Sequence, residues 1–147
     1  MKIGIAPGQR FYELGMGACG DVVRHAEQLG FDAIWVTDHV APCEQLPGTY
    51  PYRADGSAPF GPGAPWHDPF VLMSFLAAAT TRMRIGHLLR RRERSCTDSG
   101  AIRDYAGLGV DHLWLTPWAD DTSPRTISSM KQTLDQCAER FISAHQN

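Results

Sequence analysis

Residues 26–40, AEQLGFDAIWVTDHV, decide the fold class, because within them an amphipathic helix gives way to a short β-strand. The helix is predicted over residues 21–29, where apolar residues recur at helical spacing after Asp21, a good N-cap. Gly30 supplies the helix stop, because glycine readily adopts the left-handed backbone found after helix ends. The apolar run AIWV (33–36) is typical of a buried strand.

The same alternation of strand and helix continues on both sides of this stretch. Further strands are predicted over residues 2–6, 82–89 and 112–116. Further helices are predicted from Asp68 and Pro69 to about residue 80, over residues 102–108, and after Ser123 and Pro124. Alternation of this kind implies βαβ crossovers, so the sequence predicts an α/β fold with about four parallel strands and outer helices.

Residues 41–66 interrupt the alternation with a long loop, since they hold six prolines and four glycines. Proline and glycine at this density stop both helices and central strands. Long loops inside compact domains are uncommon and often cover a binding site. We therefore interpret this proline-rich loop as a candidate lid within one domain that spans residues 1–147.

Composition and charge exclude several classes of partner. The 147 residues carry a formal net charge of -2, so no broad positive field favours a nucleic acid or an acidic membrane surface. The one dense basic run, Arg90 to Arg92, is short, and such runs are usually solvated faces. The sequence shows neither a secretory signal nor an apolar stretch of the roughly 18 residues that a membrane span needs. We therefore expect a cytoplasmic protein.

The cysteines and histidines do not form a metal-ligand pattern. The cysteines are scattered without a C-x-x-C pair, at Cys19, Cys43, Cys96 and Cys137. This scatter favours reduced thiols over a disulfide framework. His39 and Cys43 stand four residues apart, but Pro42 between them would break the helix that could align them. We therefore expect no metal site.

Three blocks between residues 26 and 86 resemble a known family. They are AEQLGFDAIWVTDHV (26–40), YPYRADGSAPF (50–60) and APWHDPFVLMSFLAAATTRMRIG (64–86), in this order. With them, residues 1–89 resemble the opening third of luciferase-like flavin or deazaflavin oxidoreductases. The resemblance implies an eight-stranded (β/α) barrel that binds flavin mononucleotide (FMN) or the deazaflavin coenzyme F420 at its C-terminal face. It also implies hydride transfer to or from a small organic substrate, and some members activate oxygen.

Residues 97–143 resemble the closing segment of the same family, its last strand and final helix. The middle of the barrel is absent between the two blocks, and RRRERSC (90–96) stands where the family has an apolar, cofactor-contacting stretch. A complete barrel takes about 250 residues, so four βα units, with the last strand beside the first, make half of one.

Because the chain supplies only half of a barrel, two hypotheses remain for how it functions. In the first, a homodimer completes it, the third strand of one copy pairing with the last strand of the other. In the alternative, the chain is a catalytically degenerate fragment that acts as an assembly or interaction module through its exposed strand edges.

The resemblance also assigns roles to residues at the strand ends. Asp38 and His39 follow the second predicted strand, where the family's TDH segment faces the flavin-type ring and its histidine transfers a proton in some deazaflavin members. Imidazole changes protonation near neutral pH, as a general acid or base must. His39 is therefore the candidate catalytic residue, and Asp38, His39, Gly86 and His87 are the candidate cofactor-binding residues. From spacing alone, Asp38 would only cap a turn and His39 would only bond the backbone.

Spacing supports one rival, a dinucleotide-binding site. GMGACG (15–20) fits the pattern G-x-G-x-x-G, and Asp38 follows about twenty residues on, as in a nicotinamide-binding fold. However, Gly15 comes well after the first strand ends near Ala6, whereas this fingerprint needs a tight turn directly from strand to helix. We therefore retain FMN or F420 as the predicted cofactor.

Overall fold

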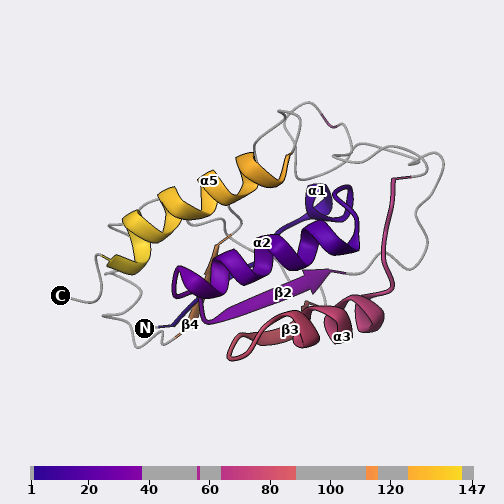
Figure 1. Cartoon of the computed structure of the whole chain (residues 1–147), viewed down its shortest axis with the longest axis horizontal. Coiled ribbons are helices and arrows are strands. Elements are labelled where there is room, and N and C mark those ends of the chain that lie inside the picture. Colours follow the sequence, from indigo (N-terminus) through magenta and orange to yellow (C-terminus); the bar gives the residue numbers. More distant parts are fainter. Residues whose placement is uncertain (1, 38–55, 57–63, 89–111, 116–125, 144–147) are drawn as a thin grey trace.

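The computed structural model describes residues 2–37, 56, 64–88, 112–115 and 126–143 (Figure 1). Its strands are β1 (Lys2–Ile5), β2 (Ala33–Thr37), β3 (Arg84–Leu88) and β4 (His112–Leu115). Its helices are α1 (Gln9–Tyr12), α2 (Met16–Gln28), α3 (Pro69–Ala79) and α5 (Ile127–Cys137), and a π-helical turn (Ala138–Ile142) continues α5. The described strands confirm the predicted strand positions to within two residues at each end.

All four strands run parallel in one sheet, in the order β3-β2-β1-β4. The last strand lies beside the first, so that Gly4 pairs with Trp114 and Ile5 with Leu115. The α/β prediction is therefore confirmed. Over the part of the chain that the structure describes, the sheet is open, with β3 and β4 as its edges. The same order also begins many doubly wound dinucleotide-binding sheets, so strand order alone does not exclude the rival.

Helices α2, α3 and α5 pack against one face of the sheet, with α2 between the other two (Figure 1). The strands contribute five branched apolar side chains to the core on this face, Ile3, Ile5, Ile34, Val36 and Leu115. The helices contribute Val22, Val23, Leu72, Leu76, Met130 and Leu134. Each such side chain stabilises the fold by roughly 1.5–3 kcal/mol when fully buried, so this layer holds the helices on the sheet.

The opposite face of the sheet carries Trp35. Successive strand residues point to opposite faces, so Trp35 points away from Ile34 and Val36 and their helices. A Cβ added to Gly86 on β3 would fall 2.4 Å from Trp35 Cζ3, and one added to Gly4 on β1 would fall 3.4 Å from Trp35 Nε1. The indole therefore lies across three strands, in space that glycine leaves free.

The predicted start of α2 is wrong. The helix begins at Met16 with Gly15 as its N-cap, and Asp21 lies inside it, where its carboxylate pairs with Arg24 one turn on. An aspartate inside a helix can be accommodated in this way, because residues three apart face each other on the helix surface. Gly30 is confirmed as the helix stop, because its φ of 94° reverses the chain after α2.

The last helix begins later than predicted. Its first residue is Ile127, and Thr126 is the N-cap: the Thr126 hydroxyl accepts from the Ser129 N–H, and the Ser129 hydroxyl accepts from the Thr126 N–H. This reciprocal pair is a capping box, which satisfies two amides that the helix itself cannot. The pair Ser123 and Pro124, the predicted helix 102–108 and most of the loop 41–66 lie outside the described residues.

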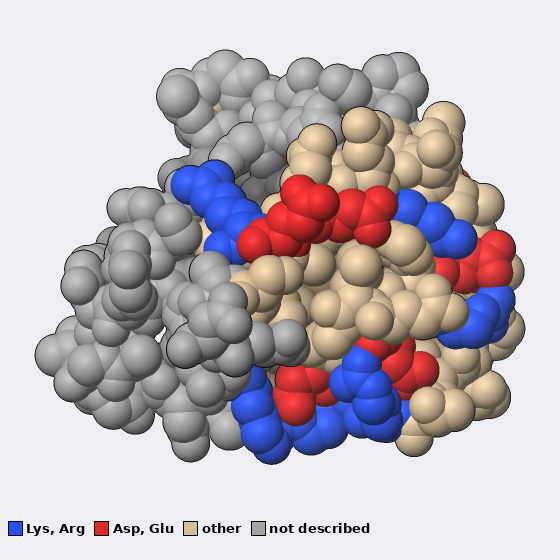
Figure 2. Space-filling model, turned by 60° about the vertical axis from the view of Figure 1, so that its left-hand side comes forward, with Lys and Arg blue, Asp and Glu red and all other residues tan. Residues whose placement is uncertain are grey.

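Charged side chains of both signs lie side by side on the described surface (Figure 2). Lys2 and Arg84 both pair with Asp32, and Arg24 pairs with Asp21. Pairs of this kind prevent a broad positive field from forming on this face. None of the helices in the described ranges is long and apolar enough to cross a membrane.

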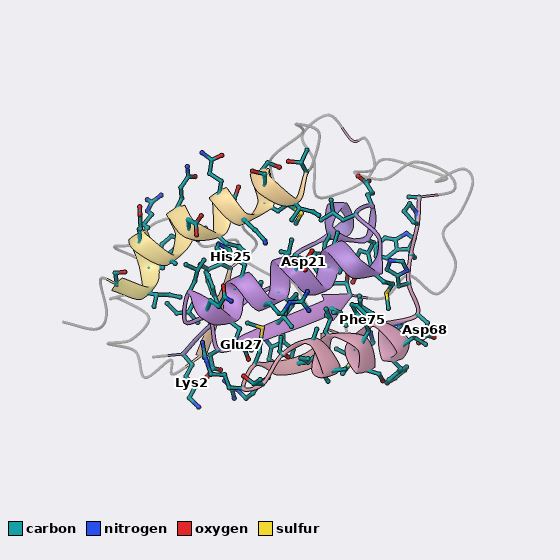
Figure 3. The ribbon with its side chains drawn as sticks, viewed as in Figure 1. Lys2, Asp21, His25, Glu27, Asp68 and Phe75 are labelled. Carbon is teal, nitrogen blue, oxygen red and sulfur yellow. The ribbon has the colours of Figure 1, made fainter. Side chains whose placement is uncertain are left out.

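Glu27 ties the end of α2 to the turn between α3 and β3 (Figure 3). Its carboxylate accepts the backbone N–H groups of Thr81, Arg82 and Met83, at 3.0, 2.6 and 2.9 Å to Oε1. These bonds, with that of Arg82 the largest contributor, lower the pKa of Glu27 below its ordinary value. One side chain therefore holds the chain reversal that places β3 beside β2.

Substituting Glu27→Ala is expected to lower the free energy of unfolding by about 1–2 kcal/mol, the cost of hydrogen bonds to an exposed charged acceptor. Because the folded-state pKa is lowered, the contribution is full above the unfolded value of about 4.3 and is lost as pH falls through the folded pKa. Urea unfolding at pH 7 and pH 3 measures it. The Glu27→Gln control keeps one acceptor and should lose less, without the pH dependence. Equal stability of wild type and Glu27→Ala at pH 7 would rule this role out.

Candidate functional site

The carboxyl ends of β1 and β2 are joined by Tyr12, which belongs to the short helix α1 after β1. Its hydroxyl accepts the Thr37 N–H at 2.8 Å and donates to the Thr37 carbonyl, also at 2.8 Å. The Thr37 hydroxyl lies 3.2 Å from the same oxygen. Tyr12 is only 1% exposed and Thr37 is half-buried, so these bonds are partly shielded from water, which strengthens them. They fix the last residue of β2.

Two of the sequence-predicted residues, Asp38 and His39, lie outside the described residues. They follow Thr37 directly in the chain, so the Tyr12 bonds fix the backbone from which both depart. Their assignment as cofactor-binding and catalytic residues stays a prediction.

Substituting Tyr12→Phe is expected to destabilise the protein by about 1–3 kcal/mol, because the Thr37 N–H would lose its acceptor in a partly buried place. The ring itself would remain, so packing against its neighbours would change little. Thermal unfolding of Tyr12→Phe and wild type measures the loss. Thr37→Val is the matched control: it removes only the hydroxyl at 3.2 Å and leaves the Thr37 N–H and carbonyl bonded to Tyr12, so it should cost less than Tyr12→Phe. Tyr12→Phe as stable as wild type would contradict the proposed contact.

An aromatic cluster lies on Tyr12 at this edge. The ring centroids of Trp66 and His67 lie 5.0 Å and 6.1 Å from that of Tyr12, both tilted to it. Trp66 and His67 are half-buried and belong to the extended segment before α3. Nε2 of His67 is shielded from solvent and has no hydrogen-bond partner among the described residues. The cluster combines flat apolar surface with a buried imidazole nitrogen.

His87 and Gly86 of β3 point to opposite faces of the sheet. His87 pairs in register with Val36, faces the helix layer and lies with its ring centroid 5.9 Å from that of Phe70. Its Nε2 is likewise solvent-shielded, with no hydrogen-bond partner in the described part of the chain. Gly86 pairs with Trp35 in unbroken register, so β3 has no bulge there. The structure therefore separates these two cofactor-binding candidates across the sheet.

The N-terminus of α3 is capped by the residue directly before it, Asp68. The Asp68 carboxylate accepts from the Phe70 N–H at 2.9 Å and the Val71 N–H at 3.0 Å, and Pro69 has no N–H, which confirms the predicted N-cap (Figure 3). The Leu72 N–H donates to the Asp68 carbonyl. With these amides occupied and a carboxylate beside them, the helix start does not offer an anion site.

The geometry argues against the dinucleotide rival. Helix α1 lies between the end of β1 and Gly15, so the tight strand-to-helix turn of that fingerprint is missing. The last glycine of the pattern, Gly20, is buried, and a Cβ there would lie 3.1 Å from the Phe75 ring of α3. Gly20 thus serves the packing of α2 against α3.

The described cysteines are poor nucleophiles. Cys19 is fully buried, its thiol donates to the Phe11 carbonyl at 3.2 Å, and burial raises its pKa to about 12. Burial also raises the pKa of Cys137. Both thiols therefore stay protonated at neutral pH. No group of three or more His, Cys, Asp or Glu side chains among the described residues could hold a metal ion.

Sequence reasoning missed Tyr12 and His67 as site residues. The pattern after the first strand gave no sign of α1, because four residues are too short a helix to show periodicity. His67 could have been noticed as the residue before the Asp68 N-cap, which places it at the carboxyl edge of the sheet. Its unpaired nitrogen, however, depends on three-dimensional packing.

Comparison with known proteins identifies the family of the chain. A family model described as luciferase-like monooxygenase matches residues 7–88, more than half of the chain. Uncharacterized proteins of Mycobacterium tuberculosis (Rv0940c) and Mycobacterium bovis (Mb0965c) are each 26% identical over 129 residues. The alignments cover 80% of this chain and 44% of each relative, so the chain spans less than half the length of the relatives it matches. No solved structure matches the chain.

The matched range contains β2, α3, β3 and the whole aromatic cluster at the carboxyl edge. This is the part of the chain in which the blocks of resemblance and the described site coincide. The chain belongs to the luciferase-like monooxygenase family.

Proposed function

We propose that this protein is an oxidoreductase that binds FMN or coenzyme F420 at the carboxyl edge of its sheet and transfers hydride to or from a small organic substrate. The observation that carries the proposal is the coincidence of the family match with a cluster of aromatic rings and unpaired imidazole nitrogens. Ligands of parallel α/β proteins bind outside the carboxyl ends of the strands, where this cluster lies.

The described residues fit the ring of either cofactor. Trp66, which packs on the buried Tyr12 ring, is half-buried and offers flat surface for stacking, and the Nε2 atoms of His67 and His87 are buried polar atoms in need of a partner. The capped start of α3 does not fit the phosphate, as Asp68 already occupies its amides. When bound, the ring would supply the hydride chemistry, and the protein would orient it and exclude water.

The candidate residues have distinct roles in this proposal. His39 holds or moves a proton during the reaction, because its imidazole can serve as acid and base near neutral pH. Asp38 and His87 bind the cofactor through side chains, whereas Gly86, on the opposite face of the sheet, contributes only by accommodating the Trp35 ring against β3. Tyr12 is a positioning residue. It holds Thr37, from which the chain continues to Asp38 and His39.

A second copy of the chain completes the barrel in this proposal. The Arg84 N–H donates to the Asp32 carbonyl of the segment entering β2, and bonding direction alternates along a strand. The N–H and C=O groups of Ile85 and His87 therefore point to the open edge of β3. Pairing β3 of each copy with β4 of the other would satisfy both edges and keep every strand parallel.

A second candidate function is that of an assembly or interaction module without catalysis. It is favoured by two large apolar side chains at the start of α3 beside the β3 edge, Phe70 and Val71, which are 67% and 60% exposed. Exposed apolar groups beside an unpaired edge strand are typical of a docking surface.

Titration of the purified protein with FMN and, separately, with F420 distinguishes the two functions. We expect saturable quenching of the ring fluorescence by one of them, at a stoichiometry of one cofactor per chain or per dimer. A folded protein that leaves both fluorescence signals unchanged would favour the interaction module.

A further inference from the structure

Two histidines of this protein differ in how their imidazole nitrogens are satisfied. Nε2 of His25 on α2 lies 2.7 Å from Oδ1 of Asp135 on α5, so this ring links two helices (Figure 3). Nε2 of His67 is shielded from solvent and lacks a hydrogen-bond partner among the described residues. A buried polar atom without a partner lowers stability, and in native proteins such an atom is usually satisfied by a water, an ion or a ligand.

The surroundings of His67 favour a flat ligand over a single water. Its ring is held against Tyr12, with centroids 6.1 Å apart, and Trp66 packs on the same tyrosine at 5.0 Å. The Tyr12 hydroxyl is occupied by Thr37 and cannot turn to satisfy the imidazole. The Asp68 carboxylate, next in the chain, is occupied by the amides of α3. Two polar side chains beside His67, those of Tyr12 and Asp68, therefore already have partners.

We propose that His67 is a further ligand-binding residue, whose Nε2 hydrogen-bonds the polar edge of the cofactor's ring system and not its phosphate. The inference rests on the proposed function, since it names the part of that cofactor which this side chain recognises. Flavin and deazaflavin rings both carry carbonyl oxygens and ring nitrogens on one edge. Either tautomer of imidazole can pair with one of these, donating to an oxygen or accepting from a ring N–H.

Stability of the free protein provides the first test. His67→Phe keeps a flat ring against Tyr12 and removes the unpaired nitrogen, so we expect the melting temperature to rise by about 3 °C without cofactor. The matched control is His25→Phe, which breaks the pair with Asp135 and should lower the melting temperature. Both variants are compared with wild type at one protein concentration, because assembly shifts the melting temperature. A fall for His67→Phe would show that the nitrogen is already satisfied and would overturn the inference.

Binding provides the second test. His67→Phe is expected to weaken the binding of FMN and of riboflavin by the same factor, about 5- to 10-fold, which corresponds to one lost hydrogen bond. If the protein takes the deazaflavin, the pair of probes is F420 and its ring fragment without the phosphate tail. His67→Gln places an amide near the position of Nε2 and should restore most of the affinity, which a purely structural role would not require.

The outcomes separate the inference from the proposed function. If wild type binds a probe and His67→Phe binds it equally well, the inference is wrong and the function stands. If His67→Phe weakened the binding of the phosphate-carrying probe only, the inference would also be wrong, because His67 would then contact the phosphate. If wild type binds none of the probes, the proposed function is wrong, and the inference that depends on it is wrong as well.

Discussion

Replacing Gly86 with alanine is expected to lower the free energy of unfolding by about 2 kcal/mol, a typical cost of forcing a methyl group into occupied space. The new Cβ would lie 2.4 Å from Cζ3 and 2.5 Å from Cε3 of Trp35, far inside the contact distance of two carbon atoms. The indole would have to leave the surface of β3 or push the strand from β2. Urea unfolding followed by circular dichroism measures the change, provided that the denaturant slope stays constant.

Two controls identify the cause of this loss. In a Trp35→Leu background, Gly86→Ala should cost less than about 0.5 kcal/mol, because the colliding ring is gone. Gly17→Ala, in α2, adds the same methyl group where nothing lies within 4 Å of the new Cβ, and should be neutral or stabilising by up to about 1 kcal/mol. If Gly86→Ala remained as costly without the indole, the strand itself and not Trp35 would demand glycine.

Substituting His39→Ala is expected to reduce turnover by at least about 100-fold, the usual contribution of a positioned general acid or base. The cofactor affinity should change far less, because the aromatic cluster on Tyr12 belongs to other segments. Steady-state kinetics with a reducible or oxidisable substrate, combined with cofactor titration, separates the two effects.

The matched control for His39 is His25→Ala. His25 bridges α2 and α5 through Asp135, away from the carboxyl ends of the strands, so its loss should affect stability and leave turnover per folded molecule unchanged. Retention of both turnover and cofactor affinity in His39→Ala would remove His39 from the site altogether.

Much of the fold was predictable from the sequence, because its elements carry strong local signals. Short runs of β-forming apolar residues gave all four described strands, and Asp68 with Pro69 marked the start of α3. The helix starts were less certain for a physical reason. Asp21 has the chemistry of an N-cap, yet it lies in mid-helix, because the helix already begins at Met16; its carboxylate pairs there with an arginine one turn on.

The site was only partly predictable. Strand ends could be inspected because parallel strands present functional groups there, and this directed attention to His87 and to the residues after Thr37. The side to which His87 points depends on register with Val36, which no local pattern encodes. The hydrogen bonds of Tyr12 to Thr37 join residues 25 positions apart, and the orphaned His67 nitrogen depends on the packing around it. Contacts of this range arise from the tertiary fold.

The central claim is that two copies of this chain together form one cofactor-binding barrel. Sedimentation velocity followed at the absorption maximum of the bound ring tests it directly, because only protein-bound cofactor sediments. The account predicts that the cofactor signal moves with a species of twice the chain mass and that dilution to the monomer releases it. Cofactor that sediments with a stable monomer would contradict the shared barrel, and a protein that carries no cofactor signal at any concentration would contradict the proposed function.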